Sequence, residues 1–347
     1  MADSPTPEPS RASVPARGAS EPAREPAFLQ VHGDLLTTAL QNFVLAQRFV
    51  GPYAVAYSGG ADSSALLHAA ARCWPGQVRA VHVHHGLQAA ADDFERHGRQ
   101  VCASVSVPLE VVHLKAHPQP GQSPEDAARR HRYAALAKAA RHHACSVVLL
   151  AQHADDQAET VLMALGRGAG LPGLSAMPER FEREGMLFAR PFLTFPGADL
   201  RRWLTERSLG FIEDPSNADE RYSRNRLRGR LMPSLAEVLP HFRQTFARSA
   251  RHAAQAQGLL DELAQLDLAQ TGMPPKLEAL RRLSWARQAN ALRHWLTAVH
   301  QVRPSAAQLD ELLAQIQACS TRGHAIELKV GAGRVYRDGN FLLYQPA

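Results

Sequence analysis

The feature that most constrains this fold is an apolar segment, Tyr53–Tyr57, that runs directly into the glycine-rich turn Ser58-Gly59-Gly60-Ala61-Asp62-Ser63-Ser64. A helical pattern through Ala65–Leu67 follows the turn. An apolar strand, a tight turn and a helix are the first parts of a parallel βαβ unit. Gly59 and Gly60 let the backbone approach a ligand closely, and the amides at the helix start point toward negative charge. The segment therefore predicts an anion-binding turn between a strand and a helix.

The same alternation continues through the first half of the chain. Short apolar strands are expected at 78–83, 109–114 and 146–151, and helices at 94–104, 123–143 and 155–165. Strands that alternate with helices of ten or more residues predict an α/β domain with a doubly wound, mostly parallel sheet. Ligands of such sheets bind at the carboxyl ends of the strands. The glycine-rich turn and the segments 82–86 and 152–159 all follow strands, so we expect them to converge on one site.

The pattern changes near Pro233. Helical periodicity covers 235–266 and 277–299, and short strands separated by turn residues are expected at 325–330, 334–337 and 341–344. We therefore predict three parts: a disordered tail rich in Pro, Ala and Ser over 1–27, a nucleotide-binding domain over 28–232, and a mainly helical domain ending in a short β-hairpin over 233–347. Trp285 and Trp295 lie ten residues apart and are predicted to share a buried helical stripe.

Composition narrows the class of protein. The 347 residues carry a net charge of +6 and a pI near 9.4, which favours a polyanionic partner if the basic residues cluster. Four widely spaced cysteines without a Cys-x-x-Cys pair suggest neither a zinc knuckle nor a disulfide scaffold, so a reducing cytoplasm is expected. The tail has no signal-peptide core, and no apolar run reaches the length of a membrane span.

The glycine-rich turn has the chemistry of a nucleotide pyrophosphate clamp. It lacks the Gly-Lys-Ser/Thr of a Walker A loop and the Gly-x-Gly-x-x-Gly of dinucleotide folds. Ser58 and Ser63 offer hydroxyl donors, and Asp62 can hold a magnesium ion. We therefore predict that Ser58, Gly59, Gly60, Ala61, Asp62 and Ser63 bind ATP, with Mg²⁺ on Asp62. An ordinary surface turn is the alternative.

A second cluster, Gln152–Thr160, contains Asp155, Asp156 and Glu159. Acidic residues at a helix start also cap free amides and favour the macrodipole, and this purely structural role is the alternative for Asp155. Asp156 and Glu159 lie three residues apart on one helical face. Together they can present two carboxylates to a cationic amine or a metal ion.

The densest basic run comprises Arg221, Arg224, Arg226, Arg228 and Arg230. Alternate arginines would share one side of a strand, whereas a helix would distribute them around its axis, and the sequence leaves this choice open. A solvated face is one interpretation of the run. Phosphate binding is the other, because the planar guanidinium group suits phosphate oxygens.

Several motifs occur in the order seen in tRNA(Ile)-lysidine synthases, a family of the PP-loop (N-type ATP pyrophosphatase) superfamily. They are Ser58–Ser63, His84-His85-Gly86-Leu87, Ala128–Tyr133, Asp155–Thr160, Arg167–Gly170, Arg190–Leu193, Glu213–Asn217 and Arg224–Arg228. The resemblance is dense over about 50–235 and continues as a pattern into a substrate-binding domain. His84 stands where an asparagine is usual, and Gln88 where an arginine is common.

The resemblance implies an ATP-dependent carbon–nitrogen ligase. Such an enzyme adenylates the wobble cytidine of the isoleucine tRNA with a CAU anticodon and releases pyrophosphate; free L-lysine then displaces AMP, which changes codon reading from AUG to AUA and identity from Met to Ile. It implies catalytic roles for Asp62, Asp156, Glu159, Arg224 and Arg228, and substrate binding by Asp156, Glu159, Arg224, Arg226 and Arg228. The oligomeric state stays open, a homodimer included.

Two other functions are weighed against this one. A tRNA thiolation enzyme of the same superfamily would adenylate a base and deliver sulfur, but such chemistry normally uses paired or reactive cysteines. A non-catalytic RNA-binding protein with the same fold is the other alternative. Loss of Asp62, Asp156 or Glu159 would have favoured it, and all three are present.

Overall fold

The computed structural model describes residues 35–84, 91–114, 124–214, 219–319 and 325–346. Three predicted parts lie outside the described residues. They are the tail (1–27), residues 85–88 at and after the end of the segment 82–86, and residues 215–217 of the motif Glu213–Asn217. Among the described residues, no helix has both the length and the apolar character needed to cross a membrane.

A six-stranded sheet forms the first half of the molecule and confirms the predicted α/β class. Its strand order is β3-β2-β1-β4-β6-β5, and all neighbouring pairs are parallel except β5 with β6. The strands are β1 (Tyr53–Ala56), β2 (Val78–His84), β3 (Leu109–His113), β4 (Val147–Leu149), β5 (Arg180–Arg183) and β6 (Met186–Ala189). The order reverses between β1 and β4, which is where open α/β sheets bind ligands.

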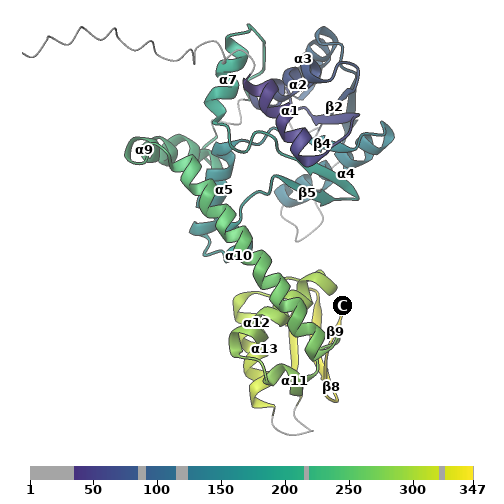
Figure 1. Ribbon diagram of the computed structural model, residues 1–347, viewed down its shortest axis with the longest axis vertical. Helices are drawn as coiled ribbons and strands as arrows, with labels where there is room; N and C mark the ends of the chain where they lie inside the picture. Colours follow the sequence, from purple (N-terminus) through teal and green to yellow (C-terminus); the bar gives the residue numbers. More distant parts are fainter. Residues whose placement is uncertain (1–34, 85–90, 115–123, 215–218, 320–324, 347) are drawn as a thin grey trace, which may run out of the picture.

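Helices cover both faces of this sheet (Figure 1). They are α1 (Leu35–Gln47), α2 (Ala61–Cys73), α3 (Ala91–Ser104), α4 (Pro124–His142), α5 (Ala154–Gly166), α6 (Leu171–Leu174) and α7 (Gly197–Thr205). Buried residues of α1, α2 and α7, such as Leu40, Leu66 and Leu204, form one core with the inward side chains of β1 and β2. On the other face, Leu136 of α4 packs with Val148 and Phe188.

The β5–β6 hairpin was not predicted from the sequence. Its strands have four residues each, and they are joined by Glu184 and Gly185, both at positive φ (54° and 63°). Two such residues are the geometry of a type I′ turn, which matches the twist of paired strands. Only β6 reaches the parallel part of the sheet, so the hairpin extends the sheet by an antiparallel edge strand.

The second half is mainly helical, as predicted. It contains α8 (Ser223–Arg226), the π-helical turn η3 (Leu227–Leu231), α9 (Met232–Val238), α10 (Phe242–Thr271), α11 (Leu277–Arg281), α12 (Trp285–His294), the π-helical turn η4 (Trp295–Val299) and α13 (Ala306–Ala318). The predicted terminal hairpin is a three-stranded antiparallel sheet of β7 (Glu327–Val330), β8 (Gly333–Asp338) and β9 (Phe341–Gln345).

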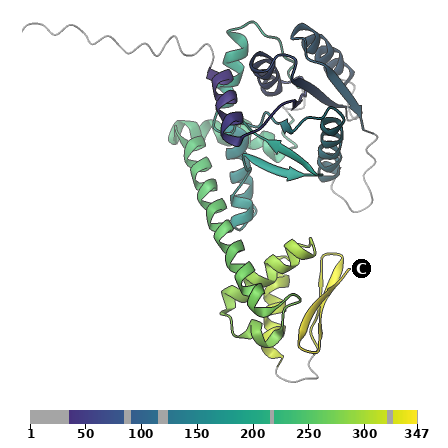
Figure 2. The ribbon, with the colours of Figure 1, turned by 45° about the vertical axis from the view of Figure 1, so that its right-hand side comes forward.

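Helix α10 links the two halves and is the long diagonal ribbon of Figures 1 and 2. Its beginning contacts α5 and α6, where Phe242 packs with Ala158 and Met232. Its end contacts α12, where Leu268 joins the core of the distal domain, defined here as residues 268–342. Leu259 and Leu266 of the predicted stripe are 60% and 62% exposed. The pattern thus predicted the helix correctly, although part of its apolar face is uncovered.

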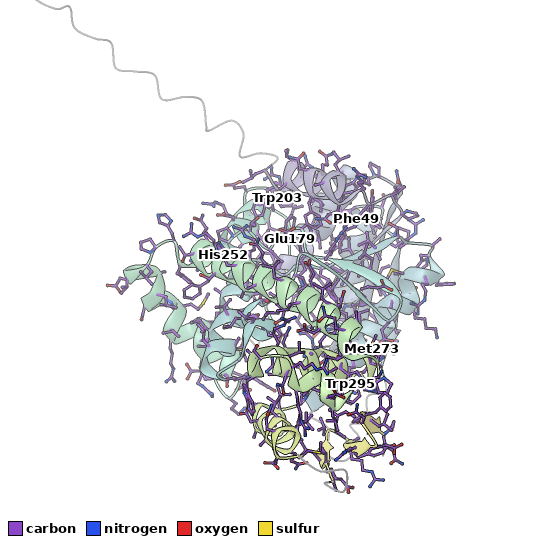
Figure 3. The ribbon with its side chains drawn as sticks, turned by 60° about the horizontal axis from the view of Figure 1, so that its bottom comes forward. Phe49, Glu179, Trp203, His252, Met273 and Trp295 are labelled. Carbon is purple, nitrogen blue, oxygen red and sulfur yellow. The ribbon has the colours of Figure 1, made fainter. Side chains whose placement is uncertain are left out.

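The prediction of a shared tryptophan stripe is wrong for Trp285. Trp295, labelled in Figure 3, is 2% exposed in the distal core, whereas Trp285 is 48% exposed. Trp285 is the first residue of α12, and the π-helical turn η4 begins at Trp295. An α-helix has about 3.6 residues per turn, so ten residues complete about 2.8 turns and leave the two side chains roughly 80° apart around the helix axis.

These two tryptophans provide a matched stability test. Trp295→Ala should lower the unfolding free energy by about 3–5 kcal/mol, because it leaves a large cavity in the distal core. Trp285→Ala should change it by less than about 1 kcal/mol, since its ring is half exposed. Urea unfolding followed by circular dichroism measures both values, and equal losses would contradict the assigned burial.

Candidate active site

The glycine-rich turn after β1 is ordered by its own serines. Oγ of Ser63 donates to the backbone oxygen of Gly60 at 3.0 Å and accepts from the backbone N–H of Ser58 at 3.1 Å. Oγ of Ser58 lies 3.0 Å from Oγ of Ser63. Gly60 is the N-cap of α2 and has no side-chain cap. The first amides of α2 therefore have no side-chain acceptor at the cap and suit an anion.

The conformation of Gly59 explains why glycine is required in this turn. Its φ is +89°, which L side chains rarely adopt, and a Cβ here would lie 3.2 Å from Cδ1 of Phe94 on α3. The backbone oxygen of Gly59 also accepts a hydrogen bond from the amide of Ile212 at 3.0 Å. The turn is therefore held between α3 and the segment that follows α7.

The second cluster begins α5 at the tip of β4. His153 is the N-cap: its backbone N–H donates to Oδ2 of Asp156 at 3.1 Å, and the amide of Asp155 lies 3.3 Å from its Nδ1. The bond from the backbone of His153 to Asp156 fixes the residue at the start of the helix. A Cβ on Gly197 would lie 2.8 Å from Cε1 of His153, so the close approach of α7 requires glycine at that position.

Three carboxylates surround the buried ring of His153. Its Nε2 lies 3.4 Å from Asp62 and 3.6 Å from Asp156, while its Nδ1 lies 3.5 Å from Oδ2 of Asp155. Burial alone would lower the pKa of His153, but hydrogen bonds to Asp155 and Asp62 and the charge of Asp156 raise it to about 10. The ring is therefore an imidazolium that donates to these carboxylates, and in that state its Nδ1–H does not accept from the amide of Asp155.

Asp155 has the structural role considered from the sequence. Its Oδ2 accepts the backbone N–H of Gly197 at 2.8 Å, and its Oδ1 pairs with Arg243 of α10. Burial would raise the pKa of Asp155, but bonds from His153, Gly197 and Arg243 hold it well below its usual range. One carboxylate thus joins the beginnings of α5, α7 and α10.

Glu159 is fully buried and pairs with two arginines. Arg228 Nε donates to its Oε1 at 2.7 Å, and Arg224 Nε lies 3.1 Å from its Oε2. Arg228 Nη2 also reaches Asp156 at 3.2 Å. Burial raises the pKa of Glu159, opposed by Arg228. Asp156 and Glu159 do present one carboxylate face, and guanidinium groups occupy that face.

From Ser223 onward the arginine run is helical, which resolves the choice between strand and helix for Arg224, Arg226, Arg228 and Arg230; Arg221 precedes the helix. Residues 223–238 form α8, η3 and α9 in succession, so Arg224 and Arg228 point to one side. Arg226 points elsewhere and donates to the backbone oxygen of Glu220 at 2.8 Å and to Oγ of Ser223 at 3.0 Å. Arg230 pairs with Glu220, and Arg221 with Asp219. The predicted set therefore separates: Arg224 and Arg228 join the carboxylates, and Arg226 does not.

Oxygen donors for a hard cation lie beside the phosphate turn. The carboxylate of Asp62 is 39% exposed, and both Asp62 and Asp156 approach the same Nε2 of His153. Mg²⁺ is commonly held by one or two carboxylates together with phosphate oxygens and water. The donor set therefore fits the ion expected from the sequence.

Sequence reasoning did not assign three residues that shape the site: His153, Arg190 and Arg243. Arg190 is buried, donates to Oε1 of Gln152 at 3.0 Å and thus supports the residue before His153. His153 lies in the cluster Gln152–Thr160 and Arg190 in the motif Arg190–Leu193, so the sequence pointed to both segments without giving these two residues a role. No sequence signal links Arg243 to Asp155, 88 residues earlier.

The charged ring of His153 predicts a pH dependence of stability. The unfolded ring titrates near pH 6.5, so its stabilising contribution is complete below that pH and is lost as pH rises toward about 10. Without magnesium or nucleotide, unfolding free energy should fall with a slope of up to about 1.4 kcal/mol per pH unit in this window. His153→Gln should remove this component, and the exposed His131→Gln should retain it. Identical pH profiles for wild type and His153→Gln would contradict the assignment.

Comparison with known proteins agrees with this architecture. A family model described as a PP-loop domain matches residues 36–235, and a TilS substrate binding domain matches residues 276–339. Among solved structures, a U34-tRNA thiolase, NcsA, from Methanococcus maripaludis superposes with a TM-score of 0.54 at 15% identity, covering 62% of this chain and 76% of its own. At that identity the likeness supports the fold alone.

Sequence relatives are closer. A tRNA(Ile)-lysidine synthase from Polaromonas naphthalenivorans is 61% identical over 85% of this chain and 90% of its own length. One from Bordetella pertussis is 42% identical over 82% and 92%, and one from Pseudomonas fluorescens is 48% identical over 70% of this chain and 57% of its own length. The resemblance noted from the motifs is thereby confirmed, and this chain belongs to the tRNA(Ile)-lysidine synthase family.

Proposed function

We propose that this protein uses ATP to join free L-lysine to C2 of the wobble cytidine in the isoleucine tRNA with a CAU anticodon. The observation that carries the proposal is the shared contact of Asp62 and Asp156 with His153. This contact brings the phosphate turn and the carboxylate pair to one place between β1 and β4. An enzyme that first activates a carbonyl and then admits an amine needs these two subsites side by side.

In the first step, the C2 carbonyl oxygen of cytidine attacks the α-phosphorus of ATP and pyrophosphate leaves. We infer that the amides of α2 and the hydroxyl of Ser58 bind the phosphates, while Ser63, whose hydroxyl donates to Gly60, holds the turn in shape. Asp62, with Asp156 nearby, would hold Mg²⁺. When bound, that ion supplies positive charge to shield the phosphate oxygens. His153 keeps Asp62 oriented and close to α5.

In the second step, an amine of lysine attacks C2 and AMP leaves. We infer that Asp156 and Glu159 bind the lysine through its positive charge. Arg228 and Arg224 stand in that place now, so the entering ammonium group competes with their guanidinium groups for the same oxygens. An arginine displaced from Glu159 is then available for the adenylate phosphate or the RNA backbone. Their exposure of 45% for Arg224 and 42% for Arg228 leaves room for this exchange.

The two halves of the chain have different roles in this proposal. We propose that residues 28–232 form the ATP-binding catalytic domain and residues 233–347 the tRNA-binding domain, with α10 between them. Magnesium use and a cytoplasmic location belong to the proposal. The wide spacing of the four cysteines along the sequence is consistent with a reducing compartment.

The thiolation alternative receives no support from cysteine placement. Cys102, Cys145 and Cys319 are buried in hydrophobic cores, and Cys73 on α2 places Sγ 3.5 Å from the backbone oxygen of Thr37. Burial raises the pKa of Cys102 to about 12, which disfavours the nucleophilic thiolate. Among the described residues, no cysteine lies beside the phosphate turn.

The proposal is tested by incubating the purified protein with ATP, magnesium, radiolabelled lysine and the CAU isoleucine tRNA, followed by nucleoside analysis. Wild type should produce an acid-stable modified cytidine. Asp62→Asn should reduce its rate by about 10²-fold or more, because charge stabilisation at the phosphates is weakened. The exposed Asp310→Asn in the distal domain is the matched control and should retain activity. A wild-type protein that leaves tRNA unlabelled, when a known synthase labels the same RNA, would refute the function.

The role of the carboxylate pair has its own test. Glu159→Gln keeps the side-chain size but removes the charge, so KM for lysine should rise about ten-fold or more while KM for ATP changes less than about two-fold. Glu220→Gln removes an exposed carboxylate that pairs with Arg230, and should leave both KM values near wild type. Equal changes in the KM values for lysine and ATP would place Glu159 outside a lysine subsite.

A further inference from the structure

A histidine–carboxylate cluster lies at the edge of the main sheet, apart from the residues assigned above. His84 ends β2 and His113 ends β3, and the two residues are register partners on neighbouring parallel strands. Glu95 belongs to α3, which contacts both strands. We propose that His84, Glu95 and His113 bind a divalent transition-metal ion, for which Zn²⁺ is the closest chemical fit.

The distances between donor atoms suit one ion. One ligand atom from each of the three side chains lies within 4.8 Å of the others. Nε2 of His113 is 3.6 Å from Oε2 of Glu95, and the rings of His84 and His113 are 4.7 Å apart between centroids. Tetrahedral zinc with bonds of about 2.1 Å places its ligand atoms about 3.4 Å apart.

Asp92 lies beside this cluster. Its Oδ1 is 3.2 Å from Nε2 of His84, and its side chain is 83% exposed. The ligand atoms that converge within 4.8 Å are those of His84, Glu95 and His113. Three protein ligands leave the fourth position of a tetrahedral zinc ion to water.

The surroundings of Glu95 orient its free oxygen toward the site. Arg99 donates to Oε1 from Nε at 3.0 Å and from Nη2 at 2.7 Å, which leaves Oε2 toward His113. A hydrogen-bonded carboxylate of this kind is typical of the outer support around metal ligands. The side chains of His84 and Glu95 are 10% and 19% exposed, whereas that of His113 is 62% exposed. The cluster is thus anchored on one side and open to entering ions on the other.

The donor types distinguish the ion. Imidazole nitrogen with carboxylate oxygen favours Zn²⁺ and related first-row ions, while Mg²⁺ prefers oxygen donors alone. A bound ion would join β2 and β3 to α3, whose Phe94 lies against Gly59 of the phosphate turn. The site would therefore brace one wall of the nucleotide pocket without taking part in the reaction.

The test uses the full chain without a histidine tag, freed of metal by chelation. Titration calorimetry with ZnCl₂ should detect this site with a dissociation constant on the order of micromolar. His113→Ala and Glu95→Gln should each weaken that binding by at least about ten-fold. Because His113 is exposed and Gln is close to Glu in size, both variants should fold, as circular dichroism will verify. Co²⁺ added to wild type gives an independent readout, since visible absorption reports nitrogen and oxygen coordination without any substitution.

Two controls separate this site from other histidines. His142 and His143 form a second group with Glu110, and His252 is exposed on α10 (Figure 3). His142→Ala and His252→Ala should bind Zn²⁺ at this site as tightly as wild type does. Unchanged Zn²⁺ affinity in both His113→Ala and Glu95→Gln would overturn the proposal. So would loss of the tight binding in His142→Ala instead, because the ion would then lie at the second group.

Discussion

The site depends on the charge balance around His153. One buried imidazolium holds Asp62 at the tip of β1 and Asp155 and Asp156 at the start of α5. Without a cation there, three acidic groups would repel one another in a poorly solvated space. Asp155 extends the network to the amide of Gly197 and to Arg243. The meeting of two strand tips is therefore fixed electrostatically as well as by the sheet.

The arginines of the helical run neutralise a second buried charge, the carboxylate of Glu159. Glu159 is completely buried, and an isolated carboxylate at that depth would be costly unless neutralised or paired. Arg224 and Arg228 supply the pairing because one helical turn separates them. The same arrangement selects ligands by charge: a group that replaces a guanidinium on the buried Glu159 must itself be positively charged.

Features of this molecule could be predicted from the sequence where the residues that determine them are close together in the chain. The strand–turn–helix at 53–67 was predicted because its apolar run, its glycines and the start of its helix are adjacent in sequence. The burial of Trp285 was predicted wrongly because ten residues of α-helix make about 2.8 turns, not three, so Trp285 at the start of α12 does not share the buried face of Trp295. The set of site residues was predicted because their motifs occur in the same order as in tRNA(Ile)-lysidine synthases. Which arginine meets which carboxylate could not be predicted, because Arg228 and Glu159 are 69 residues apart and contact through tertiary packing.

Helix α10 has a mechanical consequence. It is attached near its start through Arg243 to Asp155 and near its end through Leu268 to the distal core. Between these anchors, Gly258 has open space around it and Leu259 is exposed. Thirty residues of helix span about 45 Å, so this element works as a spacer with a set length and a set rotation. Adding one residue to its exposed middle would lengthen the gap by only about 1.5 Å but turn the distal domain by about 100°. Substitutions in its exposed middle would therefore keep this geometry, whereas insertions and deletions there would rotate one half of the molecule relative to the other.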